Sequence, residues 1–134
     1  MTQEDKLLFK DLCARWFYGV IVSVTDGTIK YNAYIESVSY KYIQVSPVDS
    51  DSIFTAYTFY KISDVKPYLR PMSSMTEEER EEYLTECDKD AESTLSAPHH
   101  HGINWLNKNM FDYCGLIPKG LAIAVTKENN PYKK

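Results

Sequence analysis

Residues 28–40 read TIKYNAYIESVSY, a stretch in which apolar and polar side chains alternate. The more apolar face of an extended chain would carry Ile29, Tyr31, Ala33 and Ile35. The opposite face would carry Lys30, Asn32, Tyr34 and Glu36. This period of two predicts a half-buried β-strand. The Asp26-Gly27 pair just before it predicts a tight hairpin turn from the preceding run.

The β character extends on both sides of this stretch, from Trp16 to Ile62. Phe17–Val24 is rich in valine and aromatic residues, Ser39–Val45 reads as a strand that Pro47 ends, and Ile53–Ile62 reads as a fourth. Four consecutive antiparallel strands leave two open edges, which strong twist or closure usually removes. The sequence therefore predicts a strongly twisted antiparallel sheet or an SH3-like partial barrel of about four strands.

Helices are expected on both sides of the β region. The first covers residues 2–15, with Thr2 as N-cap. Its apolar stripe holds Leu7, Leu8, Leu12 and Ala14, with Asp11 on the polar side. Thr76 and Glu79 form a capping box that starts a second helix reaching about Ala91. A third is predicted over Ile103–Tyr113, with Trp105 in the core and Gly115 after its end.

The whole chain, 1–134, is predicted to be a single α+β domain, because its length is typical of one. Its parts would be a helix at 1–15, a β region at 16–62, a Pro-rich connector at 63–75 and a helical C-terminal part at 76–134. The last part would include a short final strand within residues 120–125. Residues 129–134 are expected to form a fraying polar tail.

Composition excludes several classes of protein. A hydrophobic content of 43% is too high for a wholly disordered chain. No apolar run approaches the ~20 residues that span a bilayer. The net charge of −4 argues against nonspecific nucleic-acid binding. Three widely spaced cysteines and a polar N-terminus predict reduced thiols in the cytoplasm, with Cys13 and Cys114 in the core.

The sequence shows little that would support catalysis. His99, His100 and His101 are adjacent, so on an extended chain they point in different directions, whereas metal ligands usually come from separated positions that converge. Cys114 near these histidines is the one suggestion of a nucleophile. The five glycines are scattered singly, so no phosphate-cradling loop is formed. We therefore expect no metal site, no cofactor and no enzymatic activity.

Tyrosine is present in excess, with eleven copies. Those on the predicted strands cannot all face one small core, although strand propensity accounts for part of the excess. Tyrosine is favoured at recognition surfaces because it offers a large contact area at a low entropy cost. The predicted binding residues on this aromatic β face are Tyr34, Tyr57, Tyr40, Tyr42, Lys30 and Lys61.

Several stretches of the chain are familiar together: 10–15 (KDLCAR), 18–20 (YGV), 65–79 (VKPYLRPMSSMTEEE), 105–107 (WLN), 111–113 (FDY), 115–117 (GLI) and 119–122 (KGLA). In them the sequence resembles a group of small uncharacterised proteins of anaerobic gut bacteria, their phages and mobile elements. The resemblance brings no established activity and no catalytic residues. It implies a constant frame around a β region that varies between relatives.

Three functions follow from these observations. The leading interpretation is a non-enzymatic binding protein of phage or mobile-element type that holds an unknown protein partner on the aromatic β face. The first alternative is a counter-defence protein that sequesters a nucleotide-like signal molecule in a tyrosine-lined pocket. The second alternative is a small hydrolase that uses Cys114 or the histidine loop. A homo-oligomer is left open.

Overall fold

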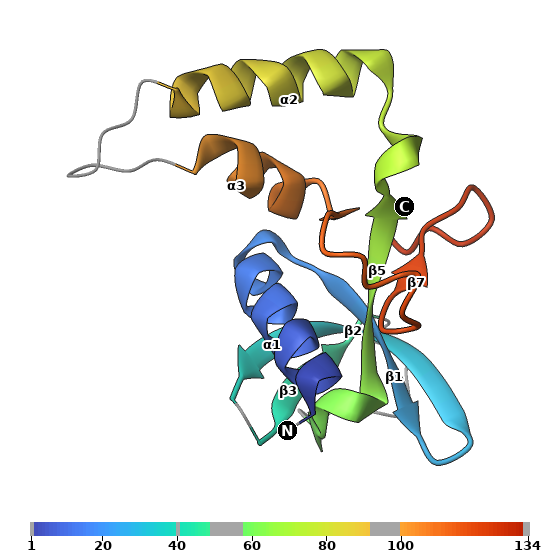
Figure 1. Cartoon of the computed structure of the whole chain (residues 1–134). Coiled ribbons are helices and arrows are strands. Elements are labelled where there is room, and N and C mark those ends of the chain that lie inside the picture. Colours follow the sequence, from blue (N-terminus) through green and yellow to red (C-terminus); the bar gives the residue numbers. More distant parts are fainter. Residues whose placement is uncertain (1, 40, 49–57, 92–99, 133–134) are drawn as a thin grey trace.

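The computed structural model describes residues 2–39, 41–48, 58–91 and 100–132 of the chain. Helix α1 (Gln3–Arg15) comes first, and helices α2 (Glu77–Asp90) and α3 (His101–Lys108) follow most of the sheet (Figure 1). The predicted α+β class is confirmed, with its N-terminal helix and two later helices. The predicted N-caps of α1 and α2 are also confirmed, because each threonine hydroxyl accepts an N–H three residues further on.

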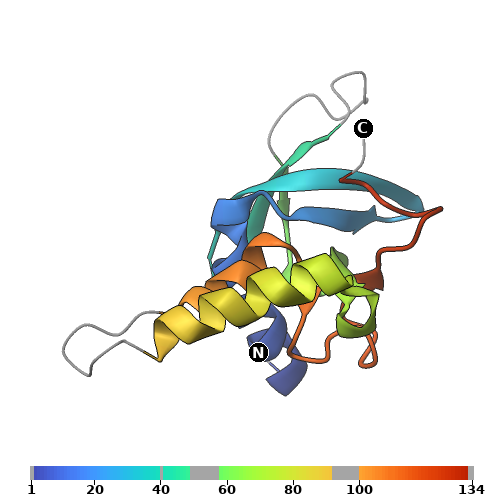
Figure 2. The same ribbon diagram turned by 90° about the horizontal axis from the view of Figure 1, so that it is seen from above.

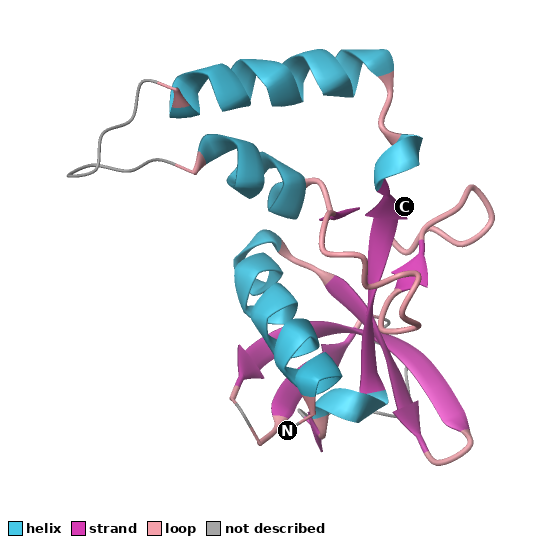
Figure 3. Ribbon diagram, viewed as in Figure 1, coloured by secondary structure: helices cyan, strands magenta, loops and turns pink. Residues whose placement is uncertain are grey.

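The strands form one mixed sheet (Figure 3). Its members are β1 (Ile21–Asp26), β2 (Ile29–Val38), β3 (Ile43–Pro47), β4 (Thr58–Tyr60), β5 (Val65–Pro71), β6 (Phe111–Asp112) and β7 (Ile123–Ala124). The order is β4-β3-β2-β1-β5-β6, and β7 also pairs with β5. The pairs from β4 to β5 are antiparallel, whereas β6 and β7 run parallel to β5. The sheet is therefore not the purely antiparallel one that the sequence predicted.

The β1–β2 hairpin confirms the turn and most of the alternation predicted from residues 28–40. Asp26 pairs with Ile29, and Gly27 between them takes a φ of 63°, which suits glycine. Ala33 and Ile35 are buried on one face, while Tyr34 on the other is exposed. Ile29 is an exception: it was predicted on the apolar face but is 42% exposed, because it sits beside the turn.

The segment predicted as a Pro-rich connector, residues 63–75, contains the strand β5, which pairs with β1, β6 and β7. Val65 and Leu69 in this strand are fully buried. Prolines are rare inside sheets because they lack an N–H, which is why the sequence pattern favoured a connector. Pro67 is tolerated because only β1 pairs with it among the described strands: β7 pairs with β5 from Tyr68 onward and β6 from Arg70 onward.

Other predicted boundaries shift at turns. The strand predicted from Phe17 begins only at Ile21, because Trp16–Tyr18 form a 3-10 turn, η1. Helix α3 begins at His101 and ends at Lys108, so its predicted extension to residue 113 is wrong. The predicted strand over residues 53–62 is described only as β4, since residues 49–57 lie outside the described part of the chain.

The main core lies between α1 and the sheet, where α1 crosses one face (Figure 1). Leu8 and Leu12 of α1 pack there against apolar residues of the sheet. Cys13 was predicted in the core but is exposed, and Asp11, predicted on the polar side, is 3% exposed. Helices α2 and α3 run side by side outside this core (Figure 2). No described helix is long and apolar enough to cross a membrane.

Candidate functional site

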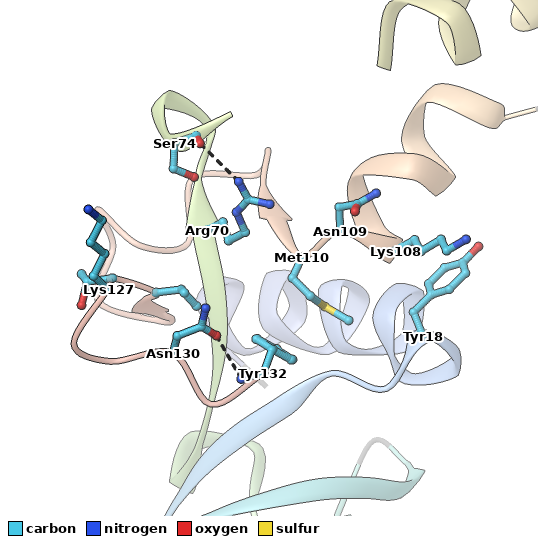
Figure 4. Close-up of a pocket in the computed structure, with 11 residues that line it drawn as sticks. Tyr18, Arg70, Ser74, Lys108, Asn109, Met110, Lys127, Asn130 and Tyr132 are labelled. Carbon is cyan, nitrogen blue, oxygen red and sulfur yellow. Dashed lines mark hydrogen bonds between the residues drawn. The ribbon is translucent and has the colours of Figure 1, made fainter. Parts of the chain in front are cut away.

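An open pocket of about 590 Å³ lies where β5, the end of α3 and the C-terminal segment meet (Figure 4). Three cationic side chains line it: Arg70, Lys108 and Lys127. The remaining lining is uncharged and includes two aromatic rings, and it contains no carboxylate among the described residues. In Figure 4, Lys127 and Lys108 stand at opposite ends of the pocket with Arg70 between them. Lys108 and Lys127 therefore give the pocket a positive charge, although the chain as a whole carries −4, while Arg70 is paired with Glu79.

Arg70 is held in place on every side. Its Nη1 and Nη2 donate to the two carboxylate oxygens of Glu79 at 2.6 and 2.7 Å. Nη2 also donates to the Ser74 carbonyl at 3.2 Å, and the guanidinium lies 4.2 Å from the centre of the Phe111 ring. The hydrogen bonds from Arg70 are the main reason why the pKa of Glu79 falls from 4.5 to about 2. A fixed guanidinium of this kind recognises planar or tetrahedral anions by paired hydrogen bonds.

Met110 lines the pocket and has an uncommon backbone conformation. Its φ is 61°, the one positive value found at a non-glycine residue in the described chain. Such a conformation costs roughly 1–2 kcal/mol. The turn directs the chain from α3 into β6, and the Met110 carbonyl accepts the Arg70 N–H at 2.7 Å. Strained residues often cluster at binding sites, so Met110 adds support for a function here.

Tyr132 and Tyr18 supply the aromatic walls. The Tyr132 hydroxyl donates to the Tyr68 carbonyl at 2.8 Å and accepts the Ile21 N–H at 3.1 Å, and burial raises the pKa of this hydroxyl. The C-terminal tail is thus tied to the sheet up to Tyr132, which corrects the predicted fraying of residues 129–132. Tyr18, in η1, is half-buried with its ring 5.7 Å from that of Phe17.

The two lysines are the available charges of the pocket. Lys108 and Lys127 are both exposed, and neither forms an ion pair within the described residues. An anion would gain from both without displacing a partner. An aromatic group beside the anion would find the Tyr18 and Tyr132 rings and the Met110 side chain. The combination suits a small molecule that carries both a ring and a negative charge.

A buried ion pair lies close behind this region. Arg15 Nε donates to Asp11 Oδ2 at 2.9 Å, and both side chains are fully buried. Arg15 also donates to the Phe111 carbonyl and lies 5.3 Å from the centre of the Tyr113 ring. Burial raises the pKa of Asp11 against the lowering effect of Arg15. Because Arg15 is not exposed, we assign it the task of holding the strand β6.

The predicted β-face residues lie elsewhere on the molecule. Tyr34 and Tyr42 are 41% and 50% exposed, and Lys30 and Lys61 are exposed as well. Tyr40 and Tyr57 lie outside the described residues. Of the predicted site residues that the structure describes, none lines the pocket.

The aromatic face also includes a residue that was not among the predicted site residues. Phe59 is 60% exposed, and its ring lies 6.5 Å from that of Tyr42. Phe59 pairs with Gln44 and Tyr34 with Ser46, so both rings project from the same face of the sheet. Phe59 thus adds a second exposed ring next to Tyr42 on this face.

Among the described residues, the contacts found for Cys114, His100 and His101 do not bring them together as a nucleophile and its base. Cys114 is partly buried, and burial raises the pKa of its thiol, whereas a nucleophilic cysteine needs a lowered one. His101 stands at the start of α3, where its Nδ1 lies 3.8 Å from a Glu86 carboxylate oxygen. His99 lies outside the described residues, and within the described part of the chain no cluster of metal-ligating side chains is found.

Comparison with protein-family models, with curated proteins and with solved structures finds no match for this chain. The resemblance of its motifs to phage and gut-bacterial proteins therefore stays a prediction. The site rests on the geometry of the pocket. Its cations come from positions as far apart as 70 and 127, so no local motif in the sequence could have revealed it.

Proposed function

We propose that this protein is a non-enzymatic binding protein whose pocket takes a small, anionic, nucleotide-like molecule. The observation that carries the proposal is the lining of one pocket by three cationic side chains and two aromatic rings, without a carboxylate among the described residues. Nucleotides offer the matching chemistry, because a base can stack on an aromatic ring while a phosphate meets arginine and lysine.

This proposal takes the tyrosine-lined pocket in preference to the aromatic β face. The pocket is concave and charged, which gives both affinity and orientation, whereas the β face is a sheet surface with scattered rings. Sequestration of a nucleotide-like signal in the cytoplasm, as a counter-defence protein of a phage or mobile element would perform it, fits a pocket without a catalytic arrangement among the described residues. We also propose, as the sequence predicted, that the twisted sheet curves into an SH3-like partial barrel.

A second candidate function rests on the β face itself. Tyr34, Tyr42 and Phe59 are all more than 40% exposed, and Tyr42 and Phe59 are in contact. Exposed aromatic residues are enriched where proteins bind partners. This face would hold a protein partner. None of its three aromatic residues lines the pocket, so the two surfaces can be tested with separate variants.

The two candidates are distinguished by thermal shift with AMP, adenosine and inorganic phosphate as probes. A ligand that binds only the folded state stabilises it by RT ln(1 + [L]/Kd), about 2.7 kcal/mol at 100 Kd. AMP should raise the melting temperature most, because it alone offers both a base and a phosphate. The double variant Lys108→Gln/Lys127→Gln should lose most of this shift.

The matched control also removes two lysine charges, but from the β face. Lys30→Gln/Lys61→Gln should respond to AMP like the wild type, since neither residue lines the pocket. If AMP, adenosine and phosphate all leave the wild-type melting temperature unchanged, the proposed nucleotide-like ligand is wrong. Loss of the AMP shift in the Lys30→Gln/Lys61→Gln variant instead would move the site to the β face.

A further inference from the structure

Arg70 has two roles, one in the pocket and one in the attachment of α2. It lines the pocket, and it also forms the ion pair that joins β5 to the first turn of α2 through Glu79. Glu79 has a second task there, because its Oε1 accepts the Thr76 N–H at 3.0 Å and so completes the N-terminal cap of α2. The side chains of Arg70 and Glu79 are 26% and 22% exposed, so the pair stands at the pocket edge within reach of solvent.

The Glu79 carboxylate occupies the part of Arg70 that an anionic ligand would use. A guanidinium has five N–H donors. In the structure three of them are taken, two by Glu79 and one by the Ser74 carbonyl. The face of the guanidinium rests on Phe111, so the group cannot turn without losing this contact. Glu79 thus already provides a two-oxygen anion for Arg70 and cancels its charge.

We propose that a phosphate group of the bound ligand displaces Glu79 from Arg70, so that filling the pocket releases the first turn of α2. This inference rests on the proposed function and names both the ligand's anionic group and the residue that competes with it. A phosphate is the fitting competitor because it carries more charge than a carboxylate and has three oxygens that can accept hydrogen bonds. Arg70 then acts as the residue that selects phosphate, and Glu79 sets how tightly it is held.

The structure also provides a path by which release of α2 reaches α3. The Phe111 ring under Arg70 stacks on Trp105 of α3 with 5.6 Å between centres and an angle of 13°. Trp105 in turn lies 5.7 Å from Tyr83 of α2. The pocket arginine and the two helices are therefore connected through three rings in contact. Trp105 reports on this stack, and Trp16→Phe leaves it as the remaining tryptophan of the chain.

The first experiment measures AMP affinity by calorimetry in the wild type and in Glu79→Gln. Glutamine keeps the capping box, because its amide oxygen can accept the Thr76 N–H, but it removes the charge. We expect Glu79→Gln to bind AMP about tenfold more tightly. Glu78→Gln is the matched control: it removes the same charge from the same turn of α2, and it should stay within about twofold of the wild type.

The second experiment measures hydrogen exchange of the α2 backbone amides with and without saturating AMP. AMP should speed exchange in the first turn of α2 in the wild type and change the fluorescence of Trp105 in the Trp16→Phe background. In an Arg70→Met background, Glu79→Gln should give no gain in AMP affinity. This arm separates direct competition for Arg70 from a general effect of charge.

The outcomes separate this inference from the proposed function. If AMP binds the wild type, but Glu79→Gln is no tighter than Glu78→Gln or α2 exchange is not increased, the competition is overturned while the proposed function stands. Binding by Glu79→Gln alone overturns both, because AMP then does not displace Glu79 from Arg70 in the wild type. If neither protein binds AMP, the proposed function fails and this inference falls with it.

Discussion

The two ends of β5 are held by different physical means. At the sheet end, α1 covers apolar strands, and β5 itself contributes the fully buried Val65 and Leu69. At the other end, α2 has no buried residue in the described structure, and discrete contacts attach it. Arg70 holds its start through Glu79, and Asp90 at its end accepts the N–H groups of His101 and Gly102 at 2.6 and 2.9 Å.

The difference shows which part of the molecule can respond to a ligand. Burial of many apolar side chains acts cooperatively, so the sheet end should unfold as one unit. The α2–α3 pair depends on a few polar contacts and on the Trp105 stack, each of which can be broken alone. The pocket lies between these two regions, with cations from both sides of it. A rigid sheet can thus hold one wall while the helix pair adjusts.

The largest effect is expected from Arg15→Leu, which tests the sheet end. This change leaves Asp11 buried without its partner, and loss of one member of a buried pair costs roughly 3–5 kcal/mol. Urea unfolding should show this loss. The double variant Asp11→Leu/Arg15→Met should recover most of it, because replacing both charges removes the unpaired one. A single variant that loses less than about 1 kcal/mol would show that Asp11 finds water or another partner.

A smaller effect is expected from Trp105→Ala, which tests the helix pair. The sequence predicts Trp105 as a core residue, and truncation of a core tryptophan costs roughly 3–5 kcal/mol. Trp105 is instead partly buried between Tyr83 and Phe111, so we expect about 2 kcal/mol by urea unfolding. Hydrogen exchange should rise more in α2 and α3 than in β1 and β2. Equal rises in both regions would remove the proposed independence of the helix pair.

The pH dependence of Glu79→Gln tests the contact between the two regions. The pKa of Glu79 is lowered from 4.5 to about 2 by Arg70, so its contribution is present above about pH 4.5 and is lost as the pH falls toward 2. At pH 7 the free energy of unfolding of the wild type should exceed that of Glu79→Gln by about 1 kcal/mol. This difference should shrink between pH 4.5 and 2.5 in thermal unfolding. A difference that stays constant over this range would mean that the ion pair does not contribute to stability.

The smallest effect is expected from Tyr34→Ser on the outer face of the sheet. Tyr34 is 41% exposed, and exposed substitutions usually change stability by about 0.5 kcal/mol or less. Ala33→Ser, one residue earlier on the buried face, is the contrasting variant and should cost more because it buries a hydroxyl. AMP binding to Tyr34→Ser should match the wild type. A large loss of stability in Tyr34→Ser would show that this ring packs against the fold.

The local signals that predicted the structure correctly are those whose deciding contacts lie within a few residues. The caps at Thr2 and Thr76 depend on a residue three positions away, and the β1–β2 turn depends on Gly27. The alternation from Ala33 to Glu36 places Tyr34 outward because a strand has a period of two. The aromatic β face could therefore be predicted in part.

Contacts between distant segments were not predictable in this way. Nothing in residues 63–75 shows that β5 receives parallel partners from residues 111–112 and 123–124, and its prolines argue against a central strand. Asp11 reads as a polar surface residue until the structure shows it buried against Arg15, which in turn donates to the Phe111 carbonyl.

The sequence by itself determined the α+β class, the starts of α1 and α2, the first hairpin and the outward Tyr34, because each of these follows from interactions within a few residues. Only the tertiary structure decided the mixed sheet around β5, the burial of Arg15 and the pocket. Arg70, Lys108 and Lys127 become one site because β5, α3 and the C-terminal segment pack together. The free energy that packs these elements together comes from burial of the apolar core. The pattern of apolar residues in the sequence does not show which charged side chains this packing brings together.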